Sequence, residues 1–234
     1  GELWHRAFTV AADTPRARYI LSLGTNVEVS GGSCAVTRHA DARVRGIKKV
    51  QVEPHLSVTG ACSAEWVPIR PKTDPAFLFA LIHSLLHEFP RERLDLAFLK
   101  NRTSSPYLIG PDGWYLRDPV SAKPLIWDTA SNSAKPFDTP GLIPALEGRF
   151  SIPQAIEIGP DDERQSLENV EGVTAFTMLA EHMKPFTPDW AGKICDVPAA
   201  TLRRIAVEYL DNACIGQTIE IDGKTLPYRP VAVT

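Results

Sequence analysis

Residues 17–28 read ARYILSLGTNVE. The short apolar run in this stretch ends at Gly24. This pattern predicts a buried strand followed by a tight turn. A helix is expected over about Ala35–Arg45, with Gly46 as its C-cap, and a second strand over Lys48–Glu53. Because two strands joined by a helix form a βαβ unit, the sequence predicts a parallel sheet.

Two further segments extend this unit. Glu65–Arg70 is predicted to be a short third strand, at an edge or strand end because it contains Pro68. A buried helix follows, with Asp74 as its cap and Pro75 as its first residue, and Pro90 ends it. Its wide apolar face consists of Phe77, Leu78, Leu81, Ile82, Leu85 and Leu86.

The second half of the chain has a different pattern. Turn residues within Tyr107–Trp127 predict a β-hairpin, and Asp128–Glu171 is expected to be irregular surface chain. Three helices should follow: Val173–Lys184, one capped by Thr187 with Pro188 as its first residue, and Ala199–Asn212, whose Arg203, Arg204 and Glu208 should face away from the core.

These elements predict an α/β fold: a Rossmann-like, open, mostly parallel sheet flanked by helices, with a C-terminal helical segment. We expect residues 1–234 to form a single domain, with 105–171 as a β-hairpin and irregular insertion within it.

Composition excludes several classes of protein. Hydrophobic residues make up 44% of the chain and charged residues 23%, which is typical of a globular protein and argues against disorder. The net charge is −3 and the basic residues are scattered, so a nucleic-acid partner is not expected. No apolar run predicts a membrane span or a signal peptide. The four cysteines form no CxxC pair, so we expect reduced, half-buried residues.

The ends of the sequence indicate a fragment of a longer polypeptide. Residue 1 is Gly, and the chain stops in a strand-like run, Pro230–Thr234. Any export signal would precede Gly1, so the sequence leaves localisation open.

Each predicted strand runs into a short polar loop: Leu23–Asn26, Val52–His55 and Arg70–Asp74. Parallel sheets bind ligands outside the carboxyl ends of their strands, so three such loops predict a nucleotide-type cofactor site. Each signal also has an ordinary interpretation. Gly24 fits a plain strand-to-loop turn, Glu53 a solvated strand-end acid, and Asp74 a helix cap.

Two longer runs resemble one family. The first is GTN (24–26) followed by VEPHLSVTGACSAEWVPIRPKTDPAFLFALIHSLLHE (52–88), and the second is MLAEHMKPFTPDWAGKICDVPAATLRRIAVEYL (178–210). They resemble the large catalytic subunits of the dimethyl sulfoxide reductase family of molybdenum enzymes. That family has a GxN turn, a strand ending in an acid-Pro-basic element, "RPGTD" before an apolar helix, and "TPEWA…TGVPAETIRRIA".

The resemblance implies an α/β domain that binds one molybdopterin guanine dinucleotide (MGD) of a bis-MGD molybdenum or tungsten centre. Carried over by position, Gly24, Thr25, Asn26, Val27 and Glu28 would lie along the pyrophosphate. Glu53, Pro54 and His55 would lie near the guanosine ribose, and Lys72, Thr73 and Asp74 at the guanine. The chain departs from the family at Lys72, usually Gly; at Val27, frequently Pro; and at Glu53, commonly Asp.

The resemblance also implies a larger enzyme, a bacterial or archaeal oxidoreductase of the cytoplasm or periplasm. In the family, an iron–sulfur domain and the protein ligand to molybdenum precede the GxN turn, so Cys34, which follows it, is not assigned as a ligand. The expected partners are the other domains of the polypeptide and an iron–sulfur electron-transfer subunit. We assign no catalytic or metal-ligating residue here, and expect the fragment alone to be inactive.

Three alternative interpretations have weaker support. His83 and His87 have the i, i+4 spacing of a zinc helix, but Ser84 stands where a zincin has Glu, so a helix-surface pair is favoured. Helix Ala199–Asn212 loosely resembles part of a helix-turn-helix, against which the negative charge argues. A nicotinamide-binding domain lacks support because there is no GxGxxG after the first strand.

Overall fold

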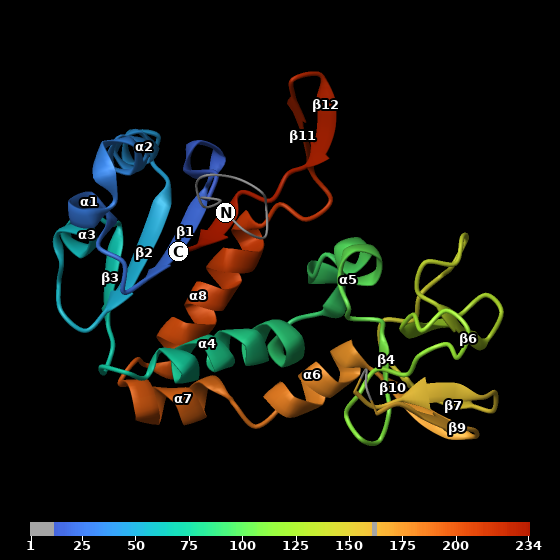
Figure 1. Cartoon of the computed structure of the whole chain (residues 1–234). Coiled ribbons are helices and arrows are strands. Elements are labelled where there is room, and N and C mark those ends of the chain that lie inside the picture. Colours follow the sequence, from blue (N-terminus) through green and yellow to red (C-terminus); the bar gives the residue numbers. More distant parts are fainter. Residues whose placement is uncertain (1–11, 161–162) are drawn as a thin grey trace. The chain divides into compact units, whose positions relative to one another are not determined.

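The computed structural model describes residues 12–160 and 163–234. The chain forms two compact units (Figure 1). The first unit comprises the chain up to Phe89 and from Pro185 onward, and the second comprises Pro90–Lys184.

The first unit is an α/β structure. Its described strands are β1 (Tyr19–Leu23), β2 (Lys48–Glu53), β3 (Glu65–Pro68), β11 (Thr218–Ile221), β12 (Lys224–Pro227) and β13 (Val231–Val233). Its helical elements are a 3-10 turn (Thr14–Arg16), α1 (Val27–Ser30), α2 (Gly32–Val44), α3 (Val58–Ala61), α4 (Asp74–His83), a π-helical turn (Ser84–Glu88), α7 (Pro188–Cys195) and α8 (Ala199–Asn212).

Four parallel strands form the sheet of this unit, in the order β13-β1-β2-β3. Tyr19 lies beside Lys48 and Val231, and Glu53 lies beside Pro68. The chain runs from β1 outward through β2 to β3, whereas β13 pairs with the other side of β1. The predicted α/β fold with a parallel sheet is therefore confirmed, and the C-terminal strand-like run is β13.

The two faces of the sheet differ in chemistry. Tyr19, Leu21, Val50 and Val52 pack with buried residues of α4, α7 and α8 in an apolar core. Because side chains alternate along a strand, the intervening residues of β2, namely Lys49, Gln51 and Glu53, point to the opposite face. They are buried there, on the side of the sheet where Figure 1 shows α1, α2 and α3.

The helix after β3 begins one residue later than its predicted cap. Thr73 is the N-cap of α4 and Asp74 is its first residue, and neither side chain makes a capping hydrogen bond. The π-helical turn then continues α4, with a hydrogen bond from Ser84 Oγ to Glu88 Oε2 at 2.9 Å. The prediction of a buried helix is correct, but Asp74 is not its N-cap.

The last two helices agree closely with prediction. Thr187 caps α7 through a hydrogen bond from the Trp190 N–H at 3.1 Å, and α8 spans the predicted Ala199–Asn212. Arg203 and Arg204 face away from the apolar core but form ion pairs with acids of neighbouring elements. No helix within the described ranges is long and apolar enough to cross a membrane.

The second unit consists mainly of short antiparallel strands. Its described elements are a 3-10 turn (Arg91–Arg93), α5 (Leu96–Arg102), β4 (Leu108–Ile109), β5 (Leu125–Asp128), β6 (Ser133–Pro136), β7 (Arg149–Ile152), β8 (Ile156–Ile158), β9 (Gln165–Leu167), β10 (Val170–Thr174) and α6 (Ala175–Met183). Its strands pair as β4-β10-β7, β5-β6 and β8-β9, all antiparallel.

Two predictions for this region need correction. Antiparallel bridges join Ile109 to Tyr115 and Arg117 to Pro124, as expected for hairpin turns. However, the segment expected to be irregular, Asp128–Glu171, contains β6 to β9 and the start of β10. These strands have three to five residues each, which is too short to give a clear period-2 pattern. The helix predicted from Val173 begins at Ala175, because Thr174 ends β10 and caps α6.

Candidate functional site

The three predicted loops lie at one edge of the first unit's sheet. They follow β1, β2 and β3, which are neighbours in the sheet, with Leu23 beside Val52 and Glu53 beside Pro68. Adjacent strands are about 5 Å apart, so the loops succeed one another along the carboxyl edge in chain order. The structure thus brings together at this edge the residues predicted from sequence: Gly24–Glu28, Glu53–His55 and Lys72–Asp74.

The first loop turns sharply at Gly24. Its φ is +65°, and no atom lies within 4 Å of the point that a Cβ would occupy, so glycine is favoured here by backbone conformation rather than by space. The Gly24 N–H donates to the Val52 carbonyl at 2.9 Å, and the Ser22 and Thr25 hydroxyls lie 2.7 Å apart. These bonds fix the loop against β1 and β2.

Asn26 carries donors that have no partner within the described chain. Its Oδ1 accepts from the Thr59 backbone N–H at 3.4 Å and lies 2.9 Å from the Thr59 hydroxyl oxygen, whose one hydrogen is donated to Glu28. Across residues 12–160 and 163–234, neither its Nδ2 nor its backbone N–H makes a hydrogen bond. A partly exposed loop with unpaired donors is suited to bind an anion.

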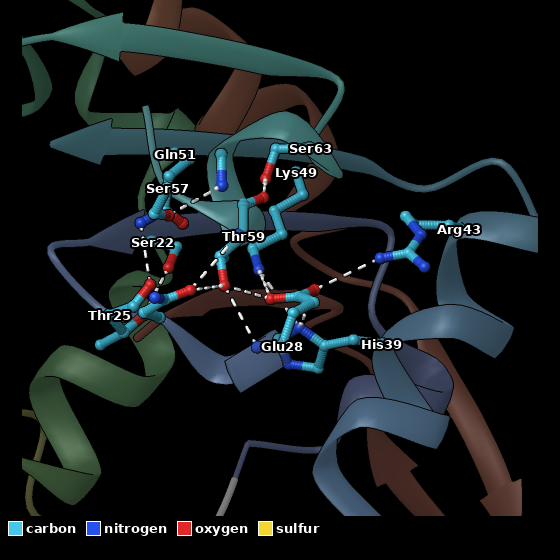
Figure 2. A network of polar contacts seen from close by, with 12 residues as sticks. Ser22, Thr25, Glu28, His39, Arg43, Lys49, Gln51, Ser57, Thr59 and Ser63 are labelled. Carbon is cyan, nitrogen blue, oxygen red and sulfur yellow. Dashed lines mark hydrogen bonds and ion pairs between the residues drawn. The ribbon is translucent and has the colours of Figure 1, made fainter. Parts of the chain in front are cut away.

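Glu28, by contrast, is turned into the protein (Figure 2). Its side chain is only 6% exposed. Its carboxylate accepts from the Thr59 hydroxyl and lies 3.5 Å from Lys49 Nζ, 3.4 Å from His39 Nδ1 and 3.4 Å from Arg43. In this arrangement Glu28 joins α1 to α2, α3 and β2. Its carboxylate does not face the carboxyl edge of the sheet.

The environment shifts the acid–base equilibria of this cluster. Burial alone would raise the pKa of Glu28, but the Thr59 hydroxyl and the Lys49 ammonium outweigh it and hold this pKa below its ordinary value. Burial, followed by the Lys49 charge, lowers the pKa of His39. Burial also lowers the pKa of Lys49. The cluster therefore contains an ionised acid beside a neutral imidazole at neutral pH.

In the second loop, the acid and its two neighbours have different roles. Glu53 is 4% exposed, and its carboxylate accepts from the Ser57 N–H at 2.7 Å and from Gln51 Nε2 at 3.0 Å. A Cβ on Gly60 would lie 2.5 Å from this carboxylate, so Gly60 permits the close approach. Pro54 and His55 are exposed. Glu53 holds the loop in place, and its predicted part at a ribose stays a prediction.

The third loop has a left-handed residue at Lys72, with φ of +65°. Thr73 Oγ1 donates to the Arg70 carbonyl at 2.6 Å, and Arg70 binds Asp196 through two hydrogen bonds of 2.9 and 2.8 Å. Asp74 is partly exposed, and its carboxylate makes no hydrogen bond or ion pair within the described residues. These hydrogen bonds hold the loop without using the Asp74 carboxylate, which remains available to a ligand.

Sequence reasoning missed the polar residues that support these loops, chiefly Lys49, Gln51 and Thr59. The signal was present in β2, which reads KKVQVE. An inner parallel strand covered on both faces is usually almost wholly apolar. Polar residues at every second position therefore indicated a buried polar network beneath the carboxyl edge.

Histidines and cysteines do not form a metal site in the described chain. The rings of His83 and His87 lie 5.0 Å apart, but His83 is buried rather than on the helix surface as predicted. No group of three or more potential ligands occurs within the described ranges. All four cysteines are free. Cys62 is half-buried as expected, whereas Cys34 is exposed and Cys195 and Cys214 are buried.

No protein-family model matches the sequence. Individual relatives do match. A sulfite dehydrogenase subunit of Allochromatium vinosum is 28% identical over 210 residues, which cover 84% of this chain and 20% of that protein. The alpha chain of perchlorate reductase from Dechloromonas aromatica is 25% identical over 73% of this chain and 21% of its own length.

A third relative is the thiosulfate reductase molybdopterin-containing subunit of Salmonella typhimurium, 33% identical over 41% of this chain and 12% of its own length. Among solved structures, acetylene hydratase from Pelobacter acetylenicus matches with a TM-score of 0.48 and 15% identity, covering 95% of this chain and 18% of that one.

The fold is that of an α/β protein, and the carboxyl edge of the first unit's parallel sheet is a candidate ligand-binding site. The chain is a distant homologue of the catalytic subunits of dimethyl sulfoxide reductase family molybdopterin enzymes, and it covers a small part of them. It spans about a fifth of the length of the first two relatives named above.

Two departures from the family pattern fall where the backbone suits the usual residue. Lys72, usually Gly in the family, has a positive φ. Val27, frequently Pro, is the first residue of α1, a position that accepts proline. The local backbone at both positions is thus compatible with the family's residues.

Proposed function

We propose that the carboxyl edge of the first unit's sheet binds the guanosine diphosphate part of an MGD cofactor. The observation that carries this proposal is that the three motif loops follow three neighbouring parallel strands in order. An extended nucleotide laid along this edge would meet the loops successively, as ligands do at the carboxyl ends of parallel strands.

The chemistry of the edge fits such a group. Asn26 offers backbone and side-chain N–H donors to phosphate oxygens. Asp74 offers a carboxylate, an acceptor that suits the adjacent N1–H and N2–H donors of guanine. Lys72 is exposed in the same loop and adds a positive charge. In this proposal Thr25 lies along the pyrophosphate, Pro54 and His55 line the ribose, and Glu28 and Glu53 act as buried supports.

At the level of the whole protein, we propose a molybdenum- or tungsten-dependent oxidoreductase that performs two-electron or oxygen-atom transfer. A bound bis-MGD centre would supply that redox chemistry, while the residues of this chain bind and orient one dinucleotide. An iron–sulfur cluster, further domains and an electron-transfer subunit belong to the same proposal. It is motivated by relatives whose names describe them as subunits of dehydrogenases and reductases.

The proposal is tested by comparing GDP and ADP binding to the 234-residue chain by calorimetry. Wild-type protein should prefer GDP, and Asp74→Asn should lose about tenfold in GDP affinity, the effect of removing one charge-assisted hydrogen-bond acceptor. Asp41→Asn, an exposed acid on α2, is the matched control and should bind GDP normally. Equal affinities for GDP and ADP in the wild type, or a preference for NAD, would reject the proposal.

A further inference from the structure

Gln51 is a buried side chain that bonds two of the candidate loops at once (Figure 2). It is fully buried near the carboxyl end of β2, on the polar face of the strand. Its Nε2 lies 2.9 Å from the Thr25 carbonyl oxygen and 3.0 Å from Glu53 Oε2. One amide group therefore connects the loop after β1 with the loop after β2.

The orientation of this amide follows from its partners. A backbone carbonyl can only accept hydrogen bonds, and an amide nitrogen has two hydrogens to donate. The amide nitrogen must therefore face Thr25 and Glu53, and each of its hydrogens has one acceptor. The oxygen Oε1 is buried and has no partner in the described chain. Within that part of the chain, the Gln51 side chain therefore acts only as a hydrogen-bond donor.

The bond to the Thr25 carbonyl determines the direction of the next N–H group. In a trans peptide, C=O and N–H point in opposite directions, and the described chain contains no cis peptide. Because Gln51 holds the Thr25 carbonyl inward, the N–H of Asn26 points away from Gln51. That N–H makes no hydrogen bond within residues 12–160 and 163–234.

We propose that Gln51 is a positioning residue, which orients the Thr25–Asn26 peptide so that the Asn26 N–H meets a phosphate oxygen of a bound nucleoside diphosphate. This inference rests on the function proposed above and adds a residue to it. The Asn26 side chain is oriented as well: its Oδ1 accepts from the Thr59 backbone N–H at 3.4 Å, so its Nδ2 donors remain for the ligand.

Other residue types do not reproduce this arrangement. Glutamate would place an acceptor against the Thr25 carbonyl and a second negative charge beside Glu53. Methionine has nearly the same length as glutamine but cannot donate, so the Thr25–Asn26 peptide would lose the bond that fixes its direction. Gln51→Met is therefore the informative variant.

The test compares GDP with guanosine, which lacks phosphates, in NMR-monitored titrations of the 234-residue chain. Gln51→Met should weaken GDP binding about tenfold and leave guanosine binding unchanged, because only the phosphate contact is affected. The Asn26 amide resonance should also shift in the ligand-free variant. Tyr19→Phe, which removes a buried hydroxyl from the opposite edge of the same sheet, is the control and should bind GDP as the wild type does.

Each result decides a different claim. If Gln51→Met binds GDP like the wild type, or loses GDP and guanosine affinity equally, the positioning role is wrong while the proposed site stands. If wild-type protein shows no GDP binding, the proposed site and this inference both fall. Should Gln51→Met not fold, Gln51→Asn retains an amide that is too short to reach both acceptors, and the same loss of GDP affinity is expected.

Discussion

Individual residues at the carboxyl edge are held in conformations that their neighbours impose. Lys72 is a clear case, since a non-glycine residue in the left-handed region costs about 1–2 kcal/mol. Sequence comparison marked Lys72 only as a departure from the family's glycine. Its φ gives that departure a physical meaning, because the loop keeps a backbone that glycine adopts readily.

Replacement of Lys72 by glycine should therefore stabilise the chain. The relief of strain exceeds the greater chain entropy that glycine gives the unfolded state, so a gain of about 0.5–1 kcal/mol in the free energy of unfolding is expected. Urea denaturation measures it. Lys72→Ala should be close to neutral and Lys72→Val destabilising. A destabilised Lys72→Gly would contradict the assigned backbone conformation.

His39 makes stability depend on pH. Its lowered pKa means that the unfolded chain takes up a proton near pH 6.5 while the folded chain does not, so folding stability is fully present above that pH and falls below it. The imidazole faces Glu28 from α1, Lys49 from β2 and Arg43 from its own helix. The lowered pKa of Glu28 acts in the same direction, but only as pH falls below about 4.5.

Urea unfolding at pH 7.5 and 5.5 tests this assignment. The wild type should be less stable at pH 5.5, and His39→Gln should lose much less stability between the two pH values. Parallel behaviour of wild type and variant would show that His39 does not cause the pH dependence.

At the scale of elements, ion pairs connect α8 to the amino ends of β2 and β3. Arg204 pairs with Glu65 and with Glu208, the latter at 2.7 Å, and Lys48 pairs with the same two acids at 3.3 and 2.7 Å. The Tyr19 hydroxyl also donates to Glu208, at 3.2 Å. Helical periodicity placed Arg204 and Glu208 correctly on the polar side of α8. It did not reveal that this side contacts the sheet edge, because that contact is between residues far apart in sequence.

Arg204→Met should cost about 1 kcal/mol in the free energy of unfolding, a modest figure because the side chain is 39% exposed. Arg203→Met should cost less, since one of its two partners, Asp189, is 68% exposed, whereas both partners of Arg204 are at most 26% exposed. Denaturation in low salt and in 1 M NaCl provides the check, because salt should reduce the Arg204 effect. An equal cost for both variants would contradict a special role for the charged cluster of Lys48, Glu65, Arg204 and Glu208.

At the scale of the whole molecule, sequence patterns predicted the first unit far better than the second. Glycine and proline residues at the ends of apolar or alternating runs defined β1, β2, and the helix formed by α4 and its π-helical turn, to within a residue or two. The strands between Asp128 and Glu171 escaped because three or four residues do not establish a period, and their pairing depends on non-local contacts such as the stacked rings of Trp127 and Phe150, 4.5 Å apart.

The candidate site was partly predictable for a related reason. Loop residues at strand ends are visible in the sequence because turn chemistry is local, whereas Gln51 and Thr59 act through contacts across 26 and 33 positions of the chain. The direction of a side chain was also beyond sequence reasoning. Glu28 and Glu53 stand in the predicted loops, yet both carboxylates point into the protein.

Amide NMR spectra of the chain, recorded with and without GDP, can show whether the carboxyl edge of this sheet is a guanine nucleotide site. GDP should perturb the resonances of Thr25 and Asn26, of His55, and of Lys72 to Asp74, with little change in the second unit. Perturbations confined to another surface, or spectra that GDP and ADP change alike, would contradict it.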